Sequence, residues 1–92
     1  MLKVRLSRQF RKDLEKARKR GLKMKKLDKV VLMLAEEQKL PPKYRDHALV
    51  TSRNYKGLRE CHIEPDWLLI YRIEGDTLTL FLARTGSHSD LF

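Results

Sequence analysis

The fold is decided by residues 58–92, whose sequence is LRECHIEPDWLLIYRIEGDTLTLFLARTGSHSDLF. Three apolar runs lie in this stretch, separated by the turn-forming segments 64–66 (Glu-Pro-Asp) and 74–76 (Glu-Gly-Asp). Apolar or alternating runs bounded by Pro, Gly and Asp are typical of β-strands. The pattern therefore predicts an antiparallel meander of three strands at the C-terminal end of the chain.

The predicted meander brings polar strand ends together. Its first strand ends at His62, its second runs from Trp67 to Ile73, and its third climbs back and ends at Arg84. Because antiparallel neighbours reverse direction, these three junctions lie at the same end of the sheet. Functional sites usually lie at strand ends and in the adjoining loops. The side chains expected at this corner are His62, Asp66, Trp67, Arg84 and His88.

Length and composition predict one small domain over residues 1–92. A chain of 92 residues forms a single modest core, and its 41% hydrophobic content is sufficient for one. The single cysteine, Cys61, excludes an internal disulfide and fits a reducing cytoplasm. No signal-peptide segment is evident, and no apolar run approaches the roughly 20 residues of a membrane span. We therefore expect a cytoplasmic protein.

The positive charge is concentrated in the first half of the chain. The formal net charge is +9. Residues 1–45 hold 16 Lys or Arg and 5 Asp or Glu, whereas residues 46–92 hold 5 Lys or Arg and 7 Asp or Glu. A segregated basic surface favours a polyanionic partner, most commonly nucleic acid. An acidic protein or a membrane surface would also satisfy this charge. For any single basic residue, a solvent-exposed helix face explains the pattern as well as direct contact with RNA does.

The first half of the chain predicts a strand followed by two helices. Residues 2–6 alternate apolar and basic side chains, as a half-buried strand does, and Ser7 can cap the helix that follows. Gly21 is a plausible stop for that helix. A second helix is expected from about Met24, ending before residues 40–42 (Leu-Pro-Pro). The predicted fold class is therefore α+β, with an N-terminal strand and a two-helix hairpin packed on an antiparallel sheet.

Residues 41–57 are predicted to form an irregular loop. The segment carries His47 and two aromatic residues that we expect to be exposed, Tyr44 and Tyr55. Long loops of this kind are often functional.

Metal and thiol chemistry find little support in the sequence. The histidines and Cys61 match no compact zinc spacing, so we expect no metal and no cofactor. Cys61 should point to the sheet face opposite His62 and act as a packing residue. The segment 85–87 (Thr-Gly-Ser) is too short for a phosphate-binding loop. Ser87 with Asp90 three positions later instead resembles a capping box.

The corner residues suit RNA cleavage. This reaction needs a base for the 2′-hydroxyl, an acid for the leaving 5′-oxygen and a cation for the developing phosphorane charge. Histidine suits proton transfer near neutral pH, and arginine suits the phosphate. On the residues alone, surface histidines and a core Trp67 explain the same pattern equally well. The candidate groups are His62, Asp66, Arg84 and His88, then His47, with Trp67 and Phe92 available to stack on bases.

Three segments resemble a known family. Residues 46–49 (DHAL), 59–71 (RECHIEPDWLLIY) and 84–92 (RTGSHSDLF) closely resemble the YafQ branch of the RelE/ParE toxin superfamily. The order of two helices and a C-terminal meander is similar as well, so the resemblance covers nearly the whole chain. One departure is the stretch 50–55, which is longer than the usual loop after the Asp-His motif.

The resemblance implies a fold, an activity and a set of site residues. Proteins of this branch are type II toxins with a compact α+β fold like that of microbial ribonucleases, and they cleave mRNA in the ribosomal A site without a metal. Carried over by position, Arg84 corresponds to the phosphate-contacting arginine and Glu60 to an acidic position flanking the site. Trp67 and Phe92 correspond to substrate-side aromatics. The proton-transfer positions correspond to His47, His62, Asp66 and His88.

The same resemblance implies partners and leaves two alternatives. The expected partners are a cognate antitoxin, the ribosome with mRNA in its A site, and operator DNA only through the antitoxin complex, with no membrane partner. One alternative is a toxin of the same fold that inhibits a protein target, as the ParE branch does. The other is a non-catalytic RNA-binding module. The set of histidine, aspartate and arginine side chains favours the enzyme, because inhibition by docking needs no proton-transfer groups.

Overall fold

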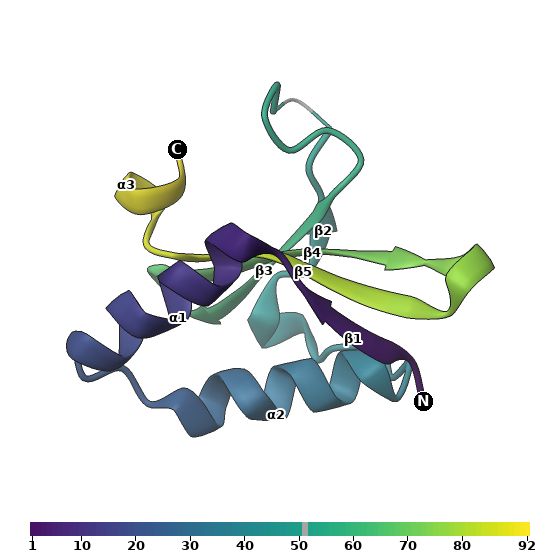
Figure 1. Cartoon of the computed structure of the whole chain (residues 1–92), viewed down its shortest axis with the longest axis horizontal. Helices are drawn as coiled ribbons and strands as arrows, with labels where there is room; N and C mark the ends of the chain where they lie inside the picture. Colours follow the sequence, from purple (N-terminus) through teal and green to yellow (C-terminus); the bar gives the residue numbers. More distant parts are fainter. Residues whose placement is uncertain (51) are drawn as a thin grey trace.

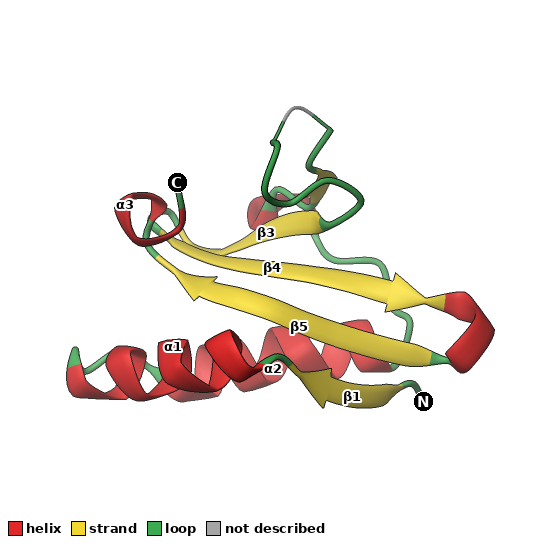
Figure 2. Ribbon diagram, turned by 45° about the horizontal axis from the view of Figure 1, so that its top comes forward, coloured by secondary structure: helices red, strands yellow, loops and turns green. Residues whose placement is uncertain are grey.

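The structure, a computed structural model, describes residues 1–50 and 52–92. It is an α+β domain with one five-stranded sheet in the order β1-β5-β4-β3-β2. Figures 1 and 2 show helix α2 along one face of this sheet, while the segment after β2 and helix α3 lie beyond the other face. The elements are β1 Lys3–Leu6, α1 Arg8–Lys19, α2 Met24–Ala35, η1 Pro42–Tyr44, β2 His47–Ala48, β3 Arg59–Glu64, β4 Trp67–Glu74, η2 Gly75–Thr77, β5 Thr79–Gly86 and α3 His88–Leu91.

The C-terminal meander predicted from the sequence is present. Strands β3, β4 and β5 pair antiparallel in sequence order, and β1 joins the outer side of β5 in parallel. β5 runs two residues beyond the predicted end at Arg84, to Gly86. The α+β prediction is therefore confirmed, and the parallel edge strand is a feature that the sequence pattern did not indicate.

The first helix begins at a serine that also binds the sheet. The Ser7 hydroxyl accepts a hydrogen bond from the Phe10 backbone N–H at 2.9 Å, which satisfies a free donor at the helix start. The same hydroxyl donates to the Ala83 carbonyl oxygen at 2.7 Å. Gly21 has φ +76°, a left-handed conformation suited to glycine, and follows the end of α1 as predicted.

Apolar side chains fill both faces of the sheet. The larger core lies between the sheet and the helices and includes Leu69, Tyr71 and Val30. A smaller core on the opposite face contains Leu68 and Ile70 and is covered by Tyr55 and Leu91. Residues alternate between the two faces of a strand, and a core covers each face of β4. Its positions from 67 to 71 are therefore all apolar. In the predicted β1 stripe, only Val4 is largely exposed (47%), because β1 is an edge strand covered on fewer sides.

The described part of the segment 41–57 contains more regular structure than its sequence suggests. It contains η1 and the short strand β2, which pairs antiparallel with β3. Asp46 anchors the segment, because it accepts hydrogen bonds from the Tyr71 hydroxyl at 2.5 Å and from Arg59. The prediction of exposed aromatics is wrong: Tyr44 is buried in the larger core and Tyr55 in the smaller one. The predicted extension at 50–55 includes Thr51, which lies outside the described residues.

We expect Ser7→Ala to lower the free energy of unfolding by about 1–3 kcal/mol, because it removes a helix cap and leaves the Ala83 carbonyl without its hydroxyl donor. Ser7→Thr is the matched control, since a threonine hydroxyl supplies both hydrogen bonds. Urea unfolding of the two variants measures the difference. Equal stability of Ser7→Ala and Ser7→Thr would show that neither bond matters.

Candidate active site

A β-bulge places the arginine on the same face as the first histidine. Tyr71 pairs with Leu82 whereas Ile70 pairs with Arg84, so Ala83 is an extra residue in β5. Such an insertion reverses the alternation of side chains beyond it. Leu82 faces the larger core, and Arg84 is consequently directed to the opposite face with Ile70.

The strand register places Glu60 and His62 on that face too. Glu60 pairs with Ile70, and His62 pairs with Leu68, which both belong to the smaller core. The neighbouring Cys61 is fully buried in the larger core, as its predicted orientation requires. Burial raises the pKa of the Cys61 thiol to about 12, so the thiol is a packing group and a poor nucleophile.

A buried carboxylate lies between two histidines. Glu60 Oε1 is 3.3 Å from His62 Nε2 and 3.6 Å from His47 Nε2. The other ring nitrogens face backbone carbonyls, with His62 Nδ1 at 3.2 Å from the Pro65 oxygen and His47 Nδ1 at 2.8 Å from the Arg45 oxygen. Glu60 is only 6% exposed. Glu60, which the resemblance places at an acidic position flanking the site, therefore has its carboxylate covered and turned toward the two imidazole rings.

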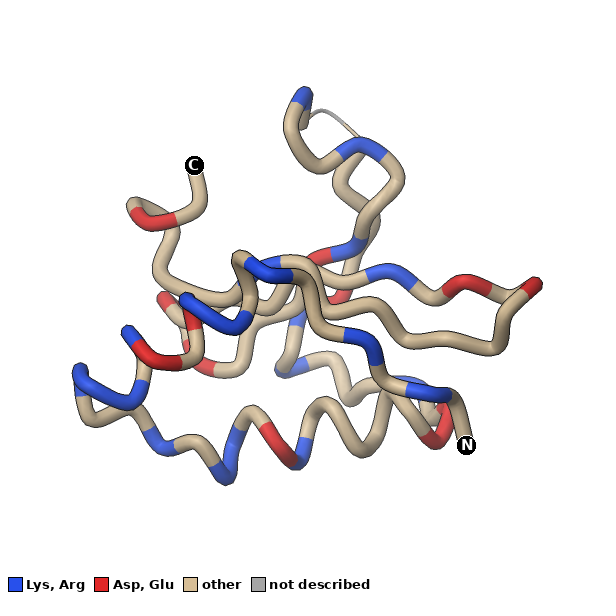
Figure 3. The backbone as a smooth tube through the Cα atoms, viewed as in Figure 1, with Lys and Arg blue, Asp and Glu red and all other residues tan. Residues whose placement is uncertain are grey.

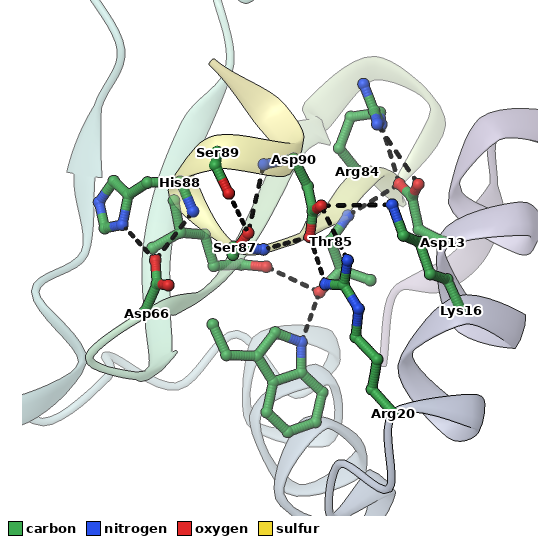
Figure 4. Close-up of polar contacts among 12 residues, drawn as sticks. Asp13, Lys16, Arg20, Asp66, Arg84, Thr85, Ser87, His88, Ser89 and Asp90 are labelled. Atoms are coloured by element: carbon green, nitrogen blue, oxygen red, sulfur yellow. Dashed lines mark hydrogen bonds and ion pairs between the residues drawn. The ribbon is translucent and has the colours of Figure 1, made fainter.

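The third histidine is held by an aspartate in the β3–β4 turn. Asp66 Oδ1 accepts hydrogen bonds from the His88 backbone N–H at 2.9 Å and lies 2.7 Å from His88 Nδ1 (Figure 4). The backbone bond, followed by the ring contact, lowers the pKa of Asp66. Asp66 is therefore ionised at neutral pH and holds the His88 ring in place, whereas a general acid must carry a proton.

Two imidazoles meet at this corner. The His62 and His88 ring centroids are 5.7 Å apart, with the rings inclined by 57°. His62 comes from β3 and His88 from the first residue of α3, so the meander and the C-terminal helix both contribute. This arrangement brings two imidazoles to one corner, as the predicted topology required, with the His62 ring largely covered and the His88 ring more than half exposed.

Arg84 is fixed by a buried aspartate of α1. Its Nε and Nη2 atoms lie 2.8 and 3.3 Å from the two Asp13 carboxylate oxygens, which raises the pKa of Arg84 (Figure 4). Nη1 donates to the Tyr55 hydroxyl at 3.3 Å. The Tyr55 ring in turn meets the Phe92 ring edge-on at 5.3 Å. Among the described residues, Arg84 makes no hydrogen bond or ion pair to the histidines.

Asp13 is a site residue that the sequence analysis missed. It is buried and also accepts the Thr85 backbone N–H at 3.1 Å. The signal lies in helical spacing, because Asp13 follows Phe10 by three residues and precedes Ala17 by four, which places it on the buried stripe. An acidic residue on the buried face of a basic helix predicts a buried cationic partner.

The two predicted base-stacking aromatics differ in exposure. Trp67 is 2% exposed, and its indole N–H donates to the Thr85 hydroxyl at 2.9 Å. Strand alternation puts it on the helix-facing side with Leu69, so the larger core covers its indole, and stacking on a base remains a prediction. Phe92, at 59% exposed, remains open to a substrate.

Helix α3 is attached to α1 by one carboxylate. Asp90 accepts bonds from Arg20 Nη1 at 2.6 Å, from Lys16 Nζ at 3.3 Å and from the Ser87 backbone N–H at 2.9 Å (Figure 4). Ser87 and Asp90 form the predicted capping box. The Arg20 and Ser87 bonds hold the pKa of Asp90 well below its usual range. This carboxylate therefore positions the helix that carries His88.

Within residues 1–50 and 52–92, no three His, Cys, Asp or Glu side chains are grouped closely enough to hold a metal ion. The carboxylates near the histidines are instead engaged with imidazole rings and backbone groups.

Solved structures place the fold among bacterial toxins. The chain matches a crystal structure of a metal-bound toxin from Helicobacter pylori with a TM-score of 0.91 and 51% identity, and each chain is covered in full. It also matches the Escherichia coli DinJ–YafQ complex with a TM-score of 0.88 and 41% identity, covering all of this chain and 99% of the other.

Sequence comparisons assign the family. The chain is 42% identical over 90 residues to the mRNA interferase toxin YafQ of Escherichia coli strain K12, covering 97% of this chain and 94% of that protein. A family model described as a bacterial toxin of type II toxin–antitoxin systems, YafQ, matches residues 2–92. The chain belongs to this family, which confirms the assignment made from the three motif segments.

We expect Asp90→Asn to destabilise the protein only where Asp90 is ionised. A depressed folded-state pKa adds stability that is complete above the unfolded value of about 3.9 and is lost as pH falls toward the folded value. The stability gap between wild type and variant should therefore be constant from pH 7 to pH 5 and shrink below pH 4. Urea unfolding at each pH measures the gap. A gap that grows on acidification would contradict the assigned ion pairs.

Proposed function

We propose that this toxin is a metal-independent endoribonuclease that cleaves mRNA in the ribosomal A site and so inhibits translation. The observation that carries the proposal is the His62–His88 pair, 5.7 Å apart, with each ring oriented by a carboxylate. The naming of the Escherichia coli relative as an mRNA interferase toxin supports it. A toxin that only blocks a protein target would need no such pair.

The proposed reaction is an in-line transfer at one phosphodiester. One imidazole takes the 2′-hydroxyl proton as the 2′-oxygen attacks phosphorus, and the other gives a proton to the departing 5′-oxygen. The bond from phosphorus to the 5′-oxygen breaks, leaving a 2′,3′-cyclic phosphate and a 5′-hydroxyl. Arg84, partly exposed on the same face, would stabilise the charge that develops on the phosphoryl oxygens.

Carboxylates would position the catalytic groups. Asp66 holds His88, Glu60 holds His62 together with His47, and Asp13 holds Arg84. Fixed rings and a fixed guanidinium lose little freedom when substrate binds, which is the usual advantage of such supports. In this account Asp66 and Glu60 are positioning residues, while His47 is a secondary candidate for proton transfer.

The proposed partners follow from charge and from the relatives. A cognate antitoxin is supported by the solved Escherichia coli complex of YafQ with DinJ. The ribosome is supported by the basic first half of the chain, which Figure 3 shows as blue segments along α1 and α2. Operator DNA is proposed to bind only through the antitoxin complex. No helix in the described part of the chain is long and apolar enough to cross a membrane.

Single substitutions should separate catalytic from supporting residues. We expect His62→Ala and His88→Ala each to slow single-turnover cleavage of ribosome-bound mRNA by about 10²–10⁴-fold, the usual loss for a general acid or base. Ser89→Ala, on the exposed surface of α3, is the control and should cleave at the wild-type rate. Melting curves verify folding. Wild-type rates in both folded histidine variants would contradict the assignment.

The ends of the products test the metal-free mechanism. Transfer from the 2′-oxygen predicts fragments with a 2′,3′-cyclic or 3′-phosphate and a 5′-hydroxyl, and none with a 5′-phosphate. Mass spectrometry of the fragments, with 5′-end labelling by polynucleotide kinase, distinguishes the two. This measurement is more direct than chelation, because ribosomes themselves require magnesium. A 5′-phosphate on the downstream fragment would contradict the proposal.

A further inference from the structure

A basic cleft lies beside the candidate active site. Its volume is about 470 Å³, and its walls come from α2, η1 and the end of β3 with the following turn. In the part of the chain that the structure describes, β2 pairs only with Arg59 and Glu60, so the last residues of β3 have no strand on that side. The charged side chains of the cleft are Lys26, Lys29, Lys43, Arg45 and Glu64.

Most of this positive charge has no acidic partner. Lys26 pairs with Glu64 at 2.6 Å. Across the described residues, no ion pair engages Lys29, Lys43 or Arg45, so the cleft carries a net charge of +3 with its histidine counted as neutral. By contrast, the cations Arg20, Lys16 and Arg84 near α3 and β5 are each paired with an aspartate. The cleft therefore holds cations that are available to attract an anion.

The cleft wall suits a sugar–phosphate backbone better than a protein partner. Its apolar side chains, Tyr44 and Ile63, are each only 7% exposed, and Pro65 is the remaining apolar contributor. Stable protein interfaces depend on buried aromatic or aliphatic anchors in pockets, and this cleft has no apolar pocket for one. Binding to RNA backbone depends on Lys and Arg contacts to phosphate.

The cleft shares one residue, His62, with the proposed catalytic set. His62 lines it while its Nε2 faces Glu60, and Pro65, another wall residue, accepts the His62 Nδ1 contact. Arg45 also lines the cleft, and its carbonyl oxygen lies 2.8 Å from His47 Nδ1. A strand bound at His62 therefore has an adjoining, positively charged path.

We propose that this cleft binds the phosphates of the mRNA strand adjoining the cleavage position, with Lys29 and Lys43 as the principal contacts. This inference rests on the proposed ribonuclease function and extends it by assigning the substrate-backbone site. An acidic antitoxin segment, or ribosomal RNA, would use the same surface charge and would have to be distinguished by experiment.

The test uses the double variant Lys29→Gln/Lys43→Gln and a matched control, Lys3→Gln/Lys25→Gln. Lys3 and Lys25 are exposed and lie outside the cleft, and their substitution removes the same amount of positive charge. Toxin binding is measured on ribosomes whose A-site codon carries 2′-O-methyl groups, which block cleavage, and on ribosomes whose mRNA ends at the P site. Binding to an acidic antitoxin peptide is measured in parallel.

We expect the cleft variant to bind the ribosomes with A-site mRNA about tenfold more weakly than the control. The slope of the logarithm of its binding constant against the logarithm of salt concentration should be shallower by about 1.4, because two phosphate contacts to single-stranded RNA are lost. Both variants should bind equally to ribosomes without A-site mRNA. The inference would be overturned if the cleft variant and the control bound equally to ribosomes with A-site mRNA. It would also be overturned if the cleft variant lost as much binding on ribosomes without A-site mRNA, or lost binding only to the antitoxin peptide.

Cleavage of unmodified mRNA by wild-type protein is recorded on the same ribosomes. If the wild type binds the ribosomes but does not cleave the mRNA, the proposed function is overturned. The cleft assignment is then decided by the binding of the cleft variant relative to the control. A wild type that cleaves, beside a cleft variant indistinguishable from its control, would overturn only the cleft assignment.

Discussion

The extra residue in β5 is the constraint on which the site depends. The strand must present Leu80 and Leu82 to the helices and yet direct Arg84 to the opposite face, which strict alternation forbids. The bulge at Ala83 resolves the conflict, and Ser7 satisfies the displaced carbonyl with its hydroxyl while capping α1. The hydrogen bond from Ser7 to Ala83 thus joins the beginning of the first helix to the strand that carries the arginine.

The functional groups are held by electrostatic pairs that come from separate parts of the chain. Asp13 of α1 fixes Arg84, and Asp66 of the β3–β4 turn fixes His88. The corner can therefore assemble only when α1, the meander and α3 are packed together. Charge-assisted hydrogen bonds are strong and directional, so they orient side chains more closely than apolar contacts do. A domain of this size gains a preorganised surface without a large pocket.

The sequence predicted the meander, the shared corner of His62 and His88, and the capping box of α3, because these depend on local periodicity and turn residues. It did not predict the bulge or the partner of Arg84, since both arise from packing between distant segments. Strand alternation buries Trp67 in the larger core, a placement that the resemblance to the family did not indicate. The segment 41–57 was misjudged because Asp46 anchors it by long-range bonds that leave no local pattern.

The pH dependence of the chemical step tests the central claim, a pair of imidazoles acting as base and acid, most directly. Single-turnover cleavage of ribosome-bound mRNA, with toxin saturating, gives the rate at each pH. We expect a bell-shaped profile for the wild type. His62→Ala should lose one limb of the bell and His88→Ala the other. A bell-shaped profile that persists unchanged in both variants would contradict it.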